Sequence, residues 1–132
     1  MTATRARIAA ALWGGFLFLL TSWPNPPAVP TGGLPLDKVT HFFLYAVEAF
    51  LLSRAIAWPG RPGFAASRVL TVVGTMALWG AVDEAHQAWI PGRAMEAGDV
   101  AADVAGAATG ALLAGARSGR RSNPGELTAA RR

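Results

Sequence analysis

Residues 69–93 have the sequence VLTVVGTMALWGAVDEAHQAWIPGR, and this stretch decides the fold. Its first part is an apolar run, and its second part carries two carboxylates, a histidine and an arginine between Asp83 and Arg93. Residues 100–116, rich in alanine and leucine, form another apolar run after the turn. Ionisable groups are costly inside a bilayer, so those found there usually serve a function. The stretch therefore predicts a polar site between two membrane-spanning helices.

The whole chain repeats this apolar pattern. It has 132 residues, of which 52% are hydrophobic and 15% charged, with a mean hydropathy of +0.32. The apolar runs cover residues 8–23, 39–58, 69–88 and 100–116. Each run makes a helix of roughly 24 to 30 Å, close to the thickness of a bilayer core. We predict an all-α fold, a membrane four-helix bundle. A soluble helical bundle is the alternative, because several runs are near the lower length limit.

The basic residues are sorted between alternate loops. With four spans and an internal N-terminus, the inner segments hold Arg5, Arg7, Arg54, Arg61, Arg68, Arg117, Arg120, Arg121, Arg131 and Arg132. The outer segments hold Lys38 and Arg93. An excess of basic residues on the inner side sets the orientation of membrane proteins. We therefore predict a multi-pass protein of the bacterial cytoplasmic membrane with both termini in the cytoplasm. Residues 1–116 form the four-span domain, and 117–132 form a basic, disordered cytoplasmic tail.

Composition also excludes several functions. The chain has no cysteine, which excludes disulfides, thiolate catalysis and cysteine-based metal sites. The pI near 11.1 comes mostly from the inner loops and the tail, so we expect the lipid bilayer as a partner and no nucleic acid. Arg5, Arg7 and the first apolar run also resemble a secretory signal peptide. Residues 21–27 lack a small-x-small cleavage site, so we predict that this helix is retained.

Polar residues follow helical spacing within three of the predicted spans. In the second span they are Lys38, His41, Tyr45 and Glu48, and Glu48 lies roughly 15 Å below Lys38 by helical rise. In the third span Asp83, His86 and Gln87 share a face, with Glu84 adjacent. In the fourth span the stripe contains Asp99, Asp103, Gly106 and Gly110, and the two glycines provide a surface for helix packing. We expect the three stripes to converge inside the bundle, because polar groups that face lipid stay unpaired.

Taken in order, these residues resemble a known family. The matching segments are Asp37-Lys38-Val39-Thr40-His41-Phe42-Phe43-Leu44-Tyr45, Asp83-Glu84-Ala85-His86-Gln87, Pro91-Gly92-Arg93, and Asp99 with Gly106 and Gly110. Over residues 35–115 the chain is similar to the VanZ-like family of small bacterial membrane proteins. The named member of that family is associated with low-level resistance to the glycopeptide teicoplanin. The resemblance implies a cell-envelope protein, without implying that this chain confers resistance.

The candidate polar site has two interpretations. Its residues are Asp37, Lys38, His41, Tyr45, Asp83, Glu84, His86, Gln87, Arg93, Asp99 and Asp103. In the first interpretation, which we favour, Lys38, His41 and Arg93 bind a phosphate or carboxylate of a lipid-linked cell-wall precursor or glycopeptide in the outer leaflet.

In the second interpretation the protein is an enzyme, whose His41 or His86 acts as a general base beside a carboxylate, with or without a divalent cation. The pattern includes no compact metal-ligand motif and no nucleophilic serine motif. The sequence therefore leaves the reaction, the metal and the oligomeric state open, since Gly106 and Gly110 suit an intramolecular contact or a dimer equally.

Overall fold

The computed structural model describes residues 1–25, 35–56 and 66–119. These residues form four helices and no strand, namely α1 (Ala3–Thr21), α2 (Leu36–Ala55), α3 (Ala66–Gln87) and α4 (Ala97–Gly119). The predicted all-α four-helix bundle is confirmed.

The helix bounds differ from the predicted apolar runs. Each helix begins three to five residues before its run. Asp37 and Asp99 lie in the first turns of α2 and α4, where a carboxylate favours a helix but lowers apolarity. Helix α4 continues through Gly119, three residues into the segment assigned to the tail. The rest of the predicted tail, 120–132, lies outside the described residues.

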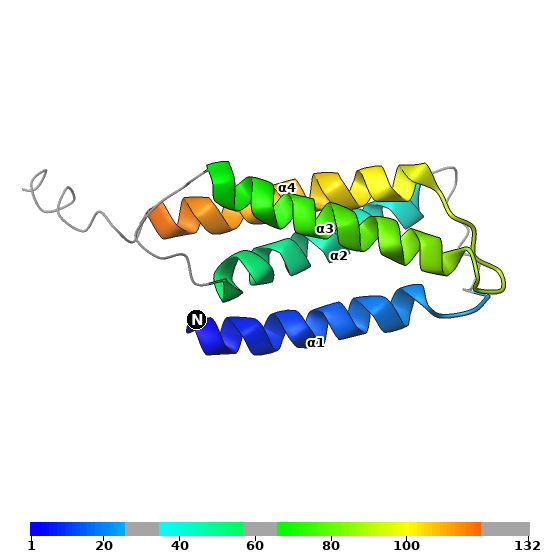
Figure 1. Cartoon of the computed structure of the whole chain (residues 1–132), viewed down its shortest axis with the longest axis horizontal. Helices are drawn as coiled ribbons and strands as arrows, with labels where there is room; N and C mark the ends of the chain where they lie inside the picture. Colours follow the sequence, from blue (N-terminus) through cyan, green and yellow to red (C-terminus); the bar gives the residue numbers. More distant parts are fainter. Residues whose placement is uncertain (26–34, 57–65, 120–132) are drawn as a thin grey trace, which may run out of the picture.

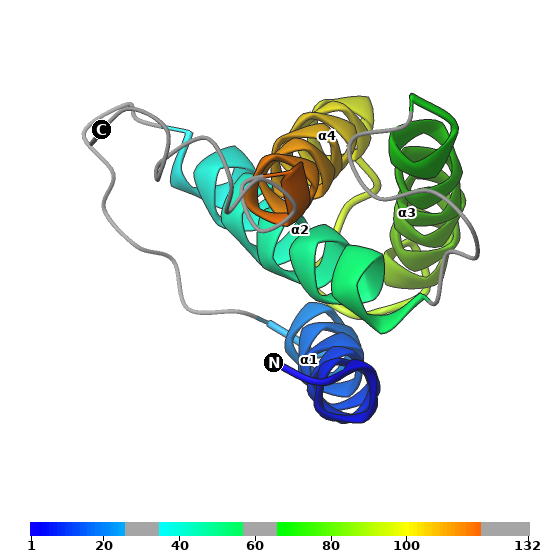
Figure 2. The same cartoon turned by 90° about the vertical axis from the view of Figure 1, so that its left-hand side faces the viewer.

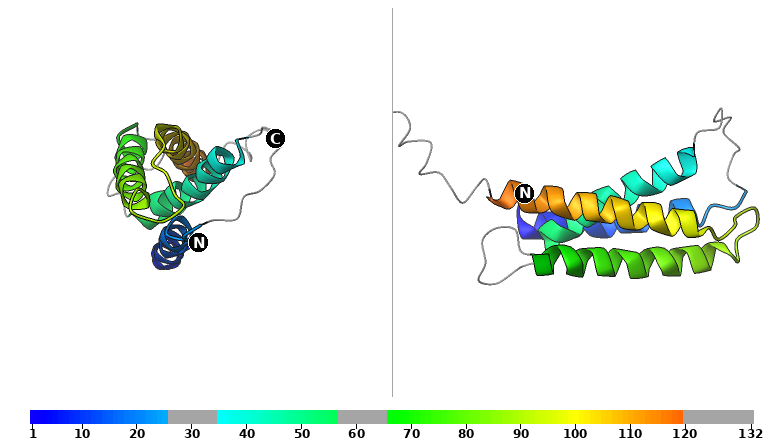
Figure 3. Two further views of the ribbon diagram at one scale, coloured as in Figure 1. Left: turned by 90° about the vertical axis from the view of Figure 1, so that its right-hand side faces the viewer. Right: turned by 90° about the horizontal axis from the view of Figure 1, so that it is seen from above.

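Helix α2 occupies the centre of the bundle. Seen end-on, it lies between α1 and α4, with α3 to one side (Figure 2). It contacts each of the other three helices, whereas α1 and α4 do not contact each other. Successive helices run in opposite directions, as Figure 1 shows. The ends of α1 and α3 and the starts of α2 and α4 therefore meet at one end of the bundle, which we call the polar end (Figure 3).

Glycines bring α4 close to α2. A Cβ atom at Gly106 would overlap the carbonyl oxygen of Phe42, and one at Gly110 would overlap that of Ala46. Replacing either glycine by any other residue would therefore push the two backbones apart. This close packing of small residues is typical of helices that associate within a membrane.

The bundle has an apolar core of modest size. Its buried members are three alanines and four larger side chains, which include Tyr45 on α2. They are Leu17, Tyr45, Ala49, Val72, Met76, Ala107 and Ala111. Because alanines and glycines dominate the interfaces, the helices pack by close backbone approach more than by interlocking large side chains.

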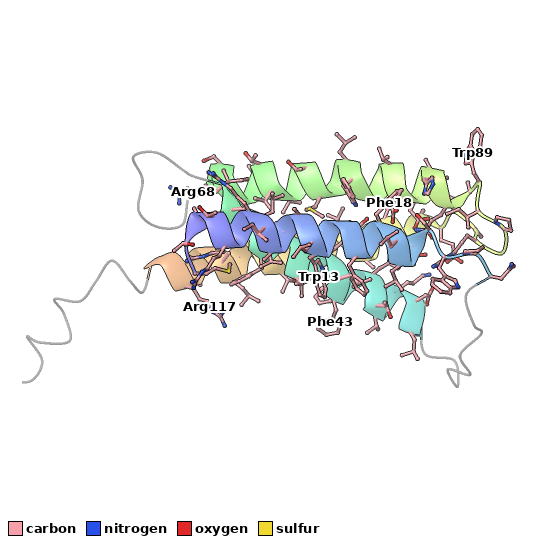
Figure 4. All side chains as sticks on the ribbon, turned by 90° about the horizontal axis from the view of Figure 1, so that it is seen from below. Trp13, Phe18, Phe43, Arg68, Trp89 and Arg117 are labelled. Atoms are coloured by element: carbon pink, nitrogen blue, oxygen red, sulfur yellow. The ribbon has the colours of Figure 1, made fainter. Side chains whose placement is uncertain are left out.

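The largest apolar side chains lie on the outside instead. Leu12, Leu78 and Phe43 are 71%, 68% and 62% exposed, although they come from three different helices. Figure 4 shows Phe43 and Trp89 projecting away from the ribbon. Within the described part of the chain, α1 is the helix long and apolar enough by itself to cross a membrane. The other helices carry more charge, and much of it is buried.

Candidate functional site

Five ionisable side chains meet inside the bundle at the polar end, and we call them the acidic cluster. They are His41 of α2, Asp83 and Glu84 of α3, and Asp99 and Asp103 of α4. None of the five residues is more than 7% exposed. Because a buried charge needs a compensating partner, such a concentration of carboxylates away from solvent identifies a candidate site.

His41 and Asp103 connect α2 to α4. Nδ1 of His41 lies 2.9 Å from Oδ1 of Asp103, which leaves Nε2 available to another partner. The Tyr45 ring stacks on that of His41 one turn further along α2, with 6.3 Å between centroids. Oδ2 of Asp103 and the Tyr45 hydroxyl are buried, and the described residues offer neither a hydrogen-bond partner.

A glycine on α3 makes room for this pair. A Cβ atom at Gly80 would lie 2.8 Å from Oδ2 of Asp103 and 3.4 Å from the Tyr45 ring. Any larger residue at Gly80 would therefore displace the Asp103 carboxylate. Three helices thus determine the position of one buried acid.

Asp83 and Glu84 are held by neutral donors. Oγ1 of Thr21, at the end of α1, donates to Asp83 over 2.8 Å. The Gln87 side-chain amide donates to both acids, at 3.2 Å to Asp83 and 3.3 Å to Glu84. The backbone N–H of Glu96 donates to Oε2 of Glu84 over 2.8 Å. The two carboxylates therefore have fixed orientations, but no cation of the described residues forms an ion pair with either of them.

Lys38 lies at the rim of the acidic cluster. Its ammonium is 2.7 Å from Asp37, 2.8 Å from Glu96 and 3.1 Å from Asp99. The hydrogen bond from Lys38 lowers the pKa of Asp37, and the three carboxylates raise the pKa of Lys38. Asp99 is buried while Asp37 and Glu96 are exposed, so Lys38 joins the buried cluster to the surface.

Arg93 lies away from the acids. Its guanidinium donates to the backbone carbonyls of Leu20, at 2.9 Å, and Trp23, at 3.3 Å, at the end of α1. Cations commonly stabilise a helix C-terminus in this way. The carbonyl of Pro91 accepts from the N–H of Asn25 over 2.9 Å. The turn 91–93 therefore fastens the α3–α4 connection to α1.

His86 is also outside the cluster. Spacing placed it on the same face as Asp83 and Gln87, and that prediction is wrong, because His86 is exposed while the other two are buried. Its ring stacks on Phe18 of α1, with 5.1 Å between centroids. The inward face of α3 instead contains residues 83, 84 and 87, and residue 86 lies to one side of it.

Glu48 belongs to a second region, further along α2. Its side chain lines a pocket of about 360 Å³ between α1, α2 and α3. Gly14 and Gly15 of α1 and Trp79 of α3 also line this pocket. Oε2 of Glu48 is buried without a hydrogen-bond partner among the described residues. We call this region the Glu48 pocket.

Two sets of side chains at the polar end have the spacing of metal ligands. His41, Glu84 and Asp99 each offer one ligand atom, and these atoms lie within 4.8 Å of one another. All three residues are buried. Asp37, Glu96 and Asp99 meet the same distance limit, but the first two are exposed. The buried set combines an imidazole with two carboxylates, while the exposed set has only carboxylates.

Sequence reasoning missed three contributors to the site, namely Thr21, Gly80 and Glu96. Thr21 ends an apolar helix, where a hydroxyl commonly bonds its own backbone, and its Oγ1 also lies 3.1 Å from the carbonyl oxygen of Leu17, which shares the one hydroxyl proton with Asp83. Glu96 contributes its backbone N–H, which every residue type except proline possesses. The spacing of Gly80 from Asp83 gave no indication of the opposing Asp103.

A small helical bundle with buried acids, an apolar exterior and a helix long and apolar enough to cross a bilayer has the features of the class of membrane-associated proteins. Residues 5–117 match the model of the VanZ/LLP1 family. The chain therefore belongs to the VanZ/LLP1 family, which confirms the resemblance seen in its motifs. No curated protein and no solved structure matches the chain.

Proposed function

We propose that this VanZ/LLP1 family protein is a multi-pass protein of the bacterial cytoplasmic membrane that binds an anionic cell-envelope molecule at its polar end. The observation that carries the proposal is the inversion of polarity. The acidic cluster is buried between the helices at the polar end, while Leu12, Leu78 and Phe43 are exposed. In water both the burial of the acids and the exposure of the apolar side chains would be unfavourable. In lipid an apolar exterior is favourable.

The distribution of basic residues supports an orientation. Figure 4 shows Arg68 and Arg117 at one end of the bundle and Trp89 at the other. The positive-inside rule places the arginine-rich end in the cytoplasm, so the polar end faces outward. In this orientation Trp89, at 87% exposed, lies at the level of the outer headgroups, which tryptophan favours.

Two basic residues at the polar end support an anionic ligand. The Lys38 side chain is 33% exposed and lies at the rim of the acidic cluster. Arg93 lies on the adjacent turn, with part of its guanidinium engaged by α1. A phosphate or carboxylate of a lipid-linked cell-wall precursor, or a glycopeptide of the teicoplanin type, has the charge that these residues attract. In this proposal the protein would be linked to glycopeptide resistance only by binding one of these two ligands.

Topology is tested by reporter fusions. Alkaline phosphatase fused after Gly32 should be active, and the same reporter fused after Gly60 should be inactive, because the two loops lie on opposite sides of the membrane. Equal activity of the two fusions, at equal protein levels, would contradict the four-span arrangement.

Ligand binding is tested on the full chain in nanodiscs. Teicoplanin and a lipid-linked cell-wall precursor are the two probes, and each is titrated separately. Lys38→Gln should weaken binding of the true ligand about tenfold, whereas Arg5→Gln, at the opposite end of the bundle, should not. Absence of binding by both probes, or equal effects of the two substitutions, would refute the proposal.

One observation favours an enzyme as the second candidate. The His41–Asp103 hydrogen bond of 2.9 Å is the arrangement that orients an imidazole as a general base. Incubating the precursor with the purified protein and analysing it by mass spectrometry separates the two functions. A product formed by the wild type and lost in His41→Gln would establish catalysis, and an unchanged precursor would leave binding as the function.

A further inference from the structure

The acidic cluster contains more negative charge than its neighbours compensate. Four carboxylates are buried there, and the Lys38 ammonium contacts Asp99 alone among them. Arg93 donates to backbone carbonyls instead. Thr21 and Gln87 supply hydrogen bonds but no charge. A buried carboxylate without a cation carries a large desolvation cost, so either protons or a bound cation must neutralise the rest.

The geometry offers a place for one cation. Ligand atoms of His41, Glu84 and Asp99 lie within 4.8 Å of one another. Ligands at about 2.1 Å from a single ion are separated by roughly 3 to 4 Å, so small side-chain rotations suffice to close around it. The three residues come from α2, α3 and α4, and a cation held by them would join three helices.

The surroundings of these three side chains are compatible with a bound metal ion. The Nδ1 atom of His41 is bonded to Asp103, which leaves Nε2 for an ion, and metal-binding imidazoles are commonly oriented by a carboxylate in this way. Glu84 is fixed by the Glu96 N–H. Oδ2 of Asp103 is fully buried and unpartnered among the described residues, and it belongs to the carboxylate that is bonded to the imidazole.

We propose that His41, Glu84 and Asp99 bind a divalent transition-metal cation, Mn²⁺ or Zn²⁺, at the polar end of the bundle. An imidazole ligand favours these ions over Mg²⁺ and Ca²⁺, which prefer oxygen ligands alone. Such a cation would offset two of the negative charges of the acidic cluster and offer open positions to an anionic headgroup. The second role rests on the proposed function, whereas metal binding itself does not.

Lys38 competes with the cation for Asp99. Its ammonium lies 3.1 Å from Oδ1 of Asp99, the carboxylate that both cations need. Removing this positive charge should tighten metal binding. The same substitution should weaken an anion that binds Lys38 directly, so Lys38 has opposite effects on the two ligands.

The test measures binding of Mn²⁺ and of Zn²⁺ to the full chain in detergent, by equilibrium dialysis with metal analysis. The wild type should bind one of these ions at about one per chain. His41→Gln and Glu84→Gln should weaken binding at least 100-fold. Asp37→Asn and Glu96→Gln are the matched controls, because they remove exposed carboxylates at the same end, and they should change affinity less than about threefold.

Two outcomes of this measurement contradict the proposal, and a variant that fails to fold calls for a further substitution. If neither ion binds, the acids are neutralised by protons. If the controls weaken binding and His41→Gln does not, the exposed carboxylates form the site. If circular dichroism shows that His41→Gln or Glu84→Gln does not fold, metal binding by Lys38→Gln is measured instead. Tighter binding than the wild type supports the buried site, and unchanged or weaker binding refutes it.

A second measurement separates this inference from the proposed function. Precursor and teicoplanin binding are compared with Mn²⁺ or Zn²⁺ present and after chelation. Metal binding without ligand binding would retain the metal site and reject the proposed function. If the ligand binds although the protein has no affinity for metal, the proposed function is retained and the metal site is rejected.

Discussion

The polar end and the Glu48 pocket differ in the hydrogen-bond partners that they offer to buried carboxylates. At the polar end each buried acid has a hydrogen-bonding neighbour from outside its own helix, such as Thr21 for Asp83, the Glu96 N–H for Glu84 and His41 for Asp103. In the Glu48 pocket one carboxylate faces glycines and a cavity of about 360 Å³. The two regions share α2, so the neighbouring helices determine whether an acid becomes part of a network.

The largest expected difference between the regions comes from leucine substitutions. His41→Leu leaves both oxygens of Asp103 without a partner and should destabilise the protein by about 3 kcal/mol. Glu48→Leu removes an acid whose Oε2 has no hydrogen-bond partner among the described residues, and it should be neutral or stabilising by about 1 kcal/mol. Chemical unfolding in detergent, followed by circular dichroism, measures both. Similar destabilisation by the two substitutions would show that the Glu48 carboxylate has a partner of equal importance.

Two glycine substitutions give the next largest difference. Gly80→Ala places a Cβ 2.8 Å from Asp103 and should cost about 1 to 3 kcal/mol. Gly15→Ala lines the Glu48 pocket, meets no atom within 4 Å, and should stabilise α1 by up to about 1 kcal/mol. The same unfolding experiment compares them. A neutral Gly80→Ala would mean that Asp103 can move freely, which would weaken the case for a fixed site.

A threonine pair tests the link from α1 to the polar end. Thr21→Val removes the donor to Asp83 and should cost about 1 to 2 kcal/mol, because the buried carboxylate loses a hydrogen bond. Thr75→Val is the control, since the Thr75 hydroxyl is exposed and bonds only the carbonyl of Thr71. Its effect should be within about 0.5 kcal/mol. Equal effects of the two substitutions would show that α1 contributes nothing specific to the cluster.

The smallest effect is expected at the rim. The hydrogen bond from Lys38 lowers the pKa of Asp37 in the folded protein, so its stabilisation is present above the unfolded pKa and is lost as pH falls through the folded value. Wild type and Asp37→Asn should therefore differ slightly near neutral pH and converge below about pH 4. Unfolding midpoints between pH 3 and 7 measure this. If the difference in unfolding midpoint between wild type and Asp37→Asn grows as the pH falls, Lys38 does not stabilise the charged form of Asp37.

The sequence predicted the helices better than the site. Long apolar runs indicate helices at any position, so all four were found, although their first turns contain polar residues such as Asp37 that the runs exclude. Spacing along one helix placed His41 and Asp103 on inward faces. The spacing argument failed for His86. Residues 83, 86 and 87 all lie within a broad sector of α3, and spacing alone does not show that the buried side of this sector is the one with residues 83, 84 and 87.

The remaining partners depend on contacts between distant parts of the chain. Thr21 and Asp83 are 62 residues apart, and no local pattern connects them. Arg93 had carboxylates nearby in sequence but bonds the end of α1, where backbone carbonyls lack helical partners. The hydrogen-bond partners of these residues depend on how the helices pack, and residue spacing in the sequence contains little information about that packing.

The contacts of Gly106 and Gly110 with the carbonyls of α2 have one further consequence, for how a ligand enters. Asp103 lies one turn from Gly106 on α4, and His41 adjoins Phe42 on α2. Sliding α4 by one helical turn, about 5.4 Å, would keep a glycine at one of these contacts and bring an alanine, Ala102 or Ala114, to the other, where its Cβ atom would overlap the α2 carbonyl. The register between the two helices is therefore locked, and a ligand of the proposed kind would reach the acidic cluster from the polar end without parting them.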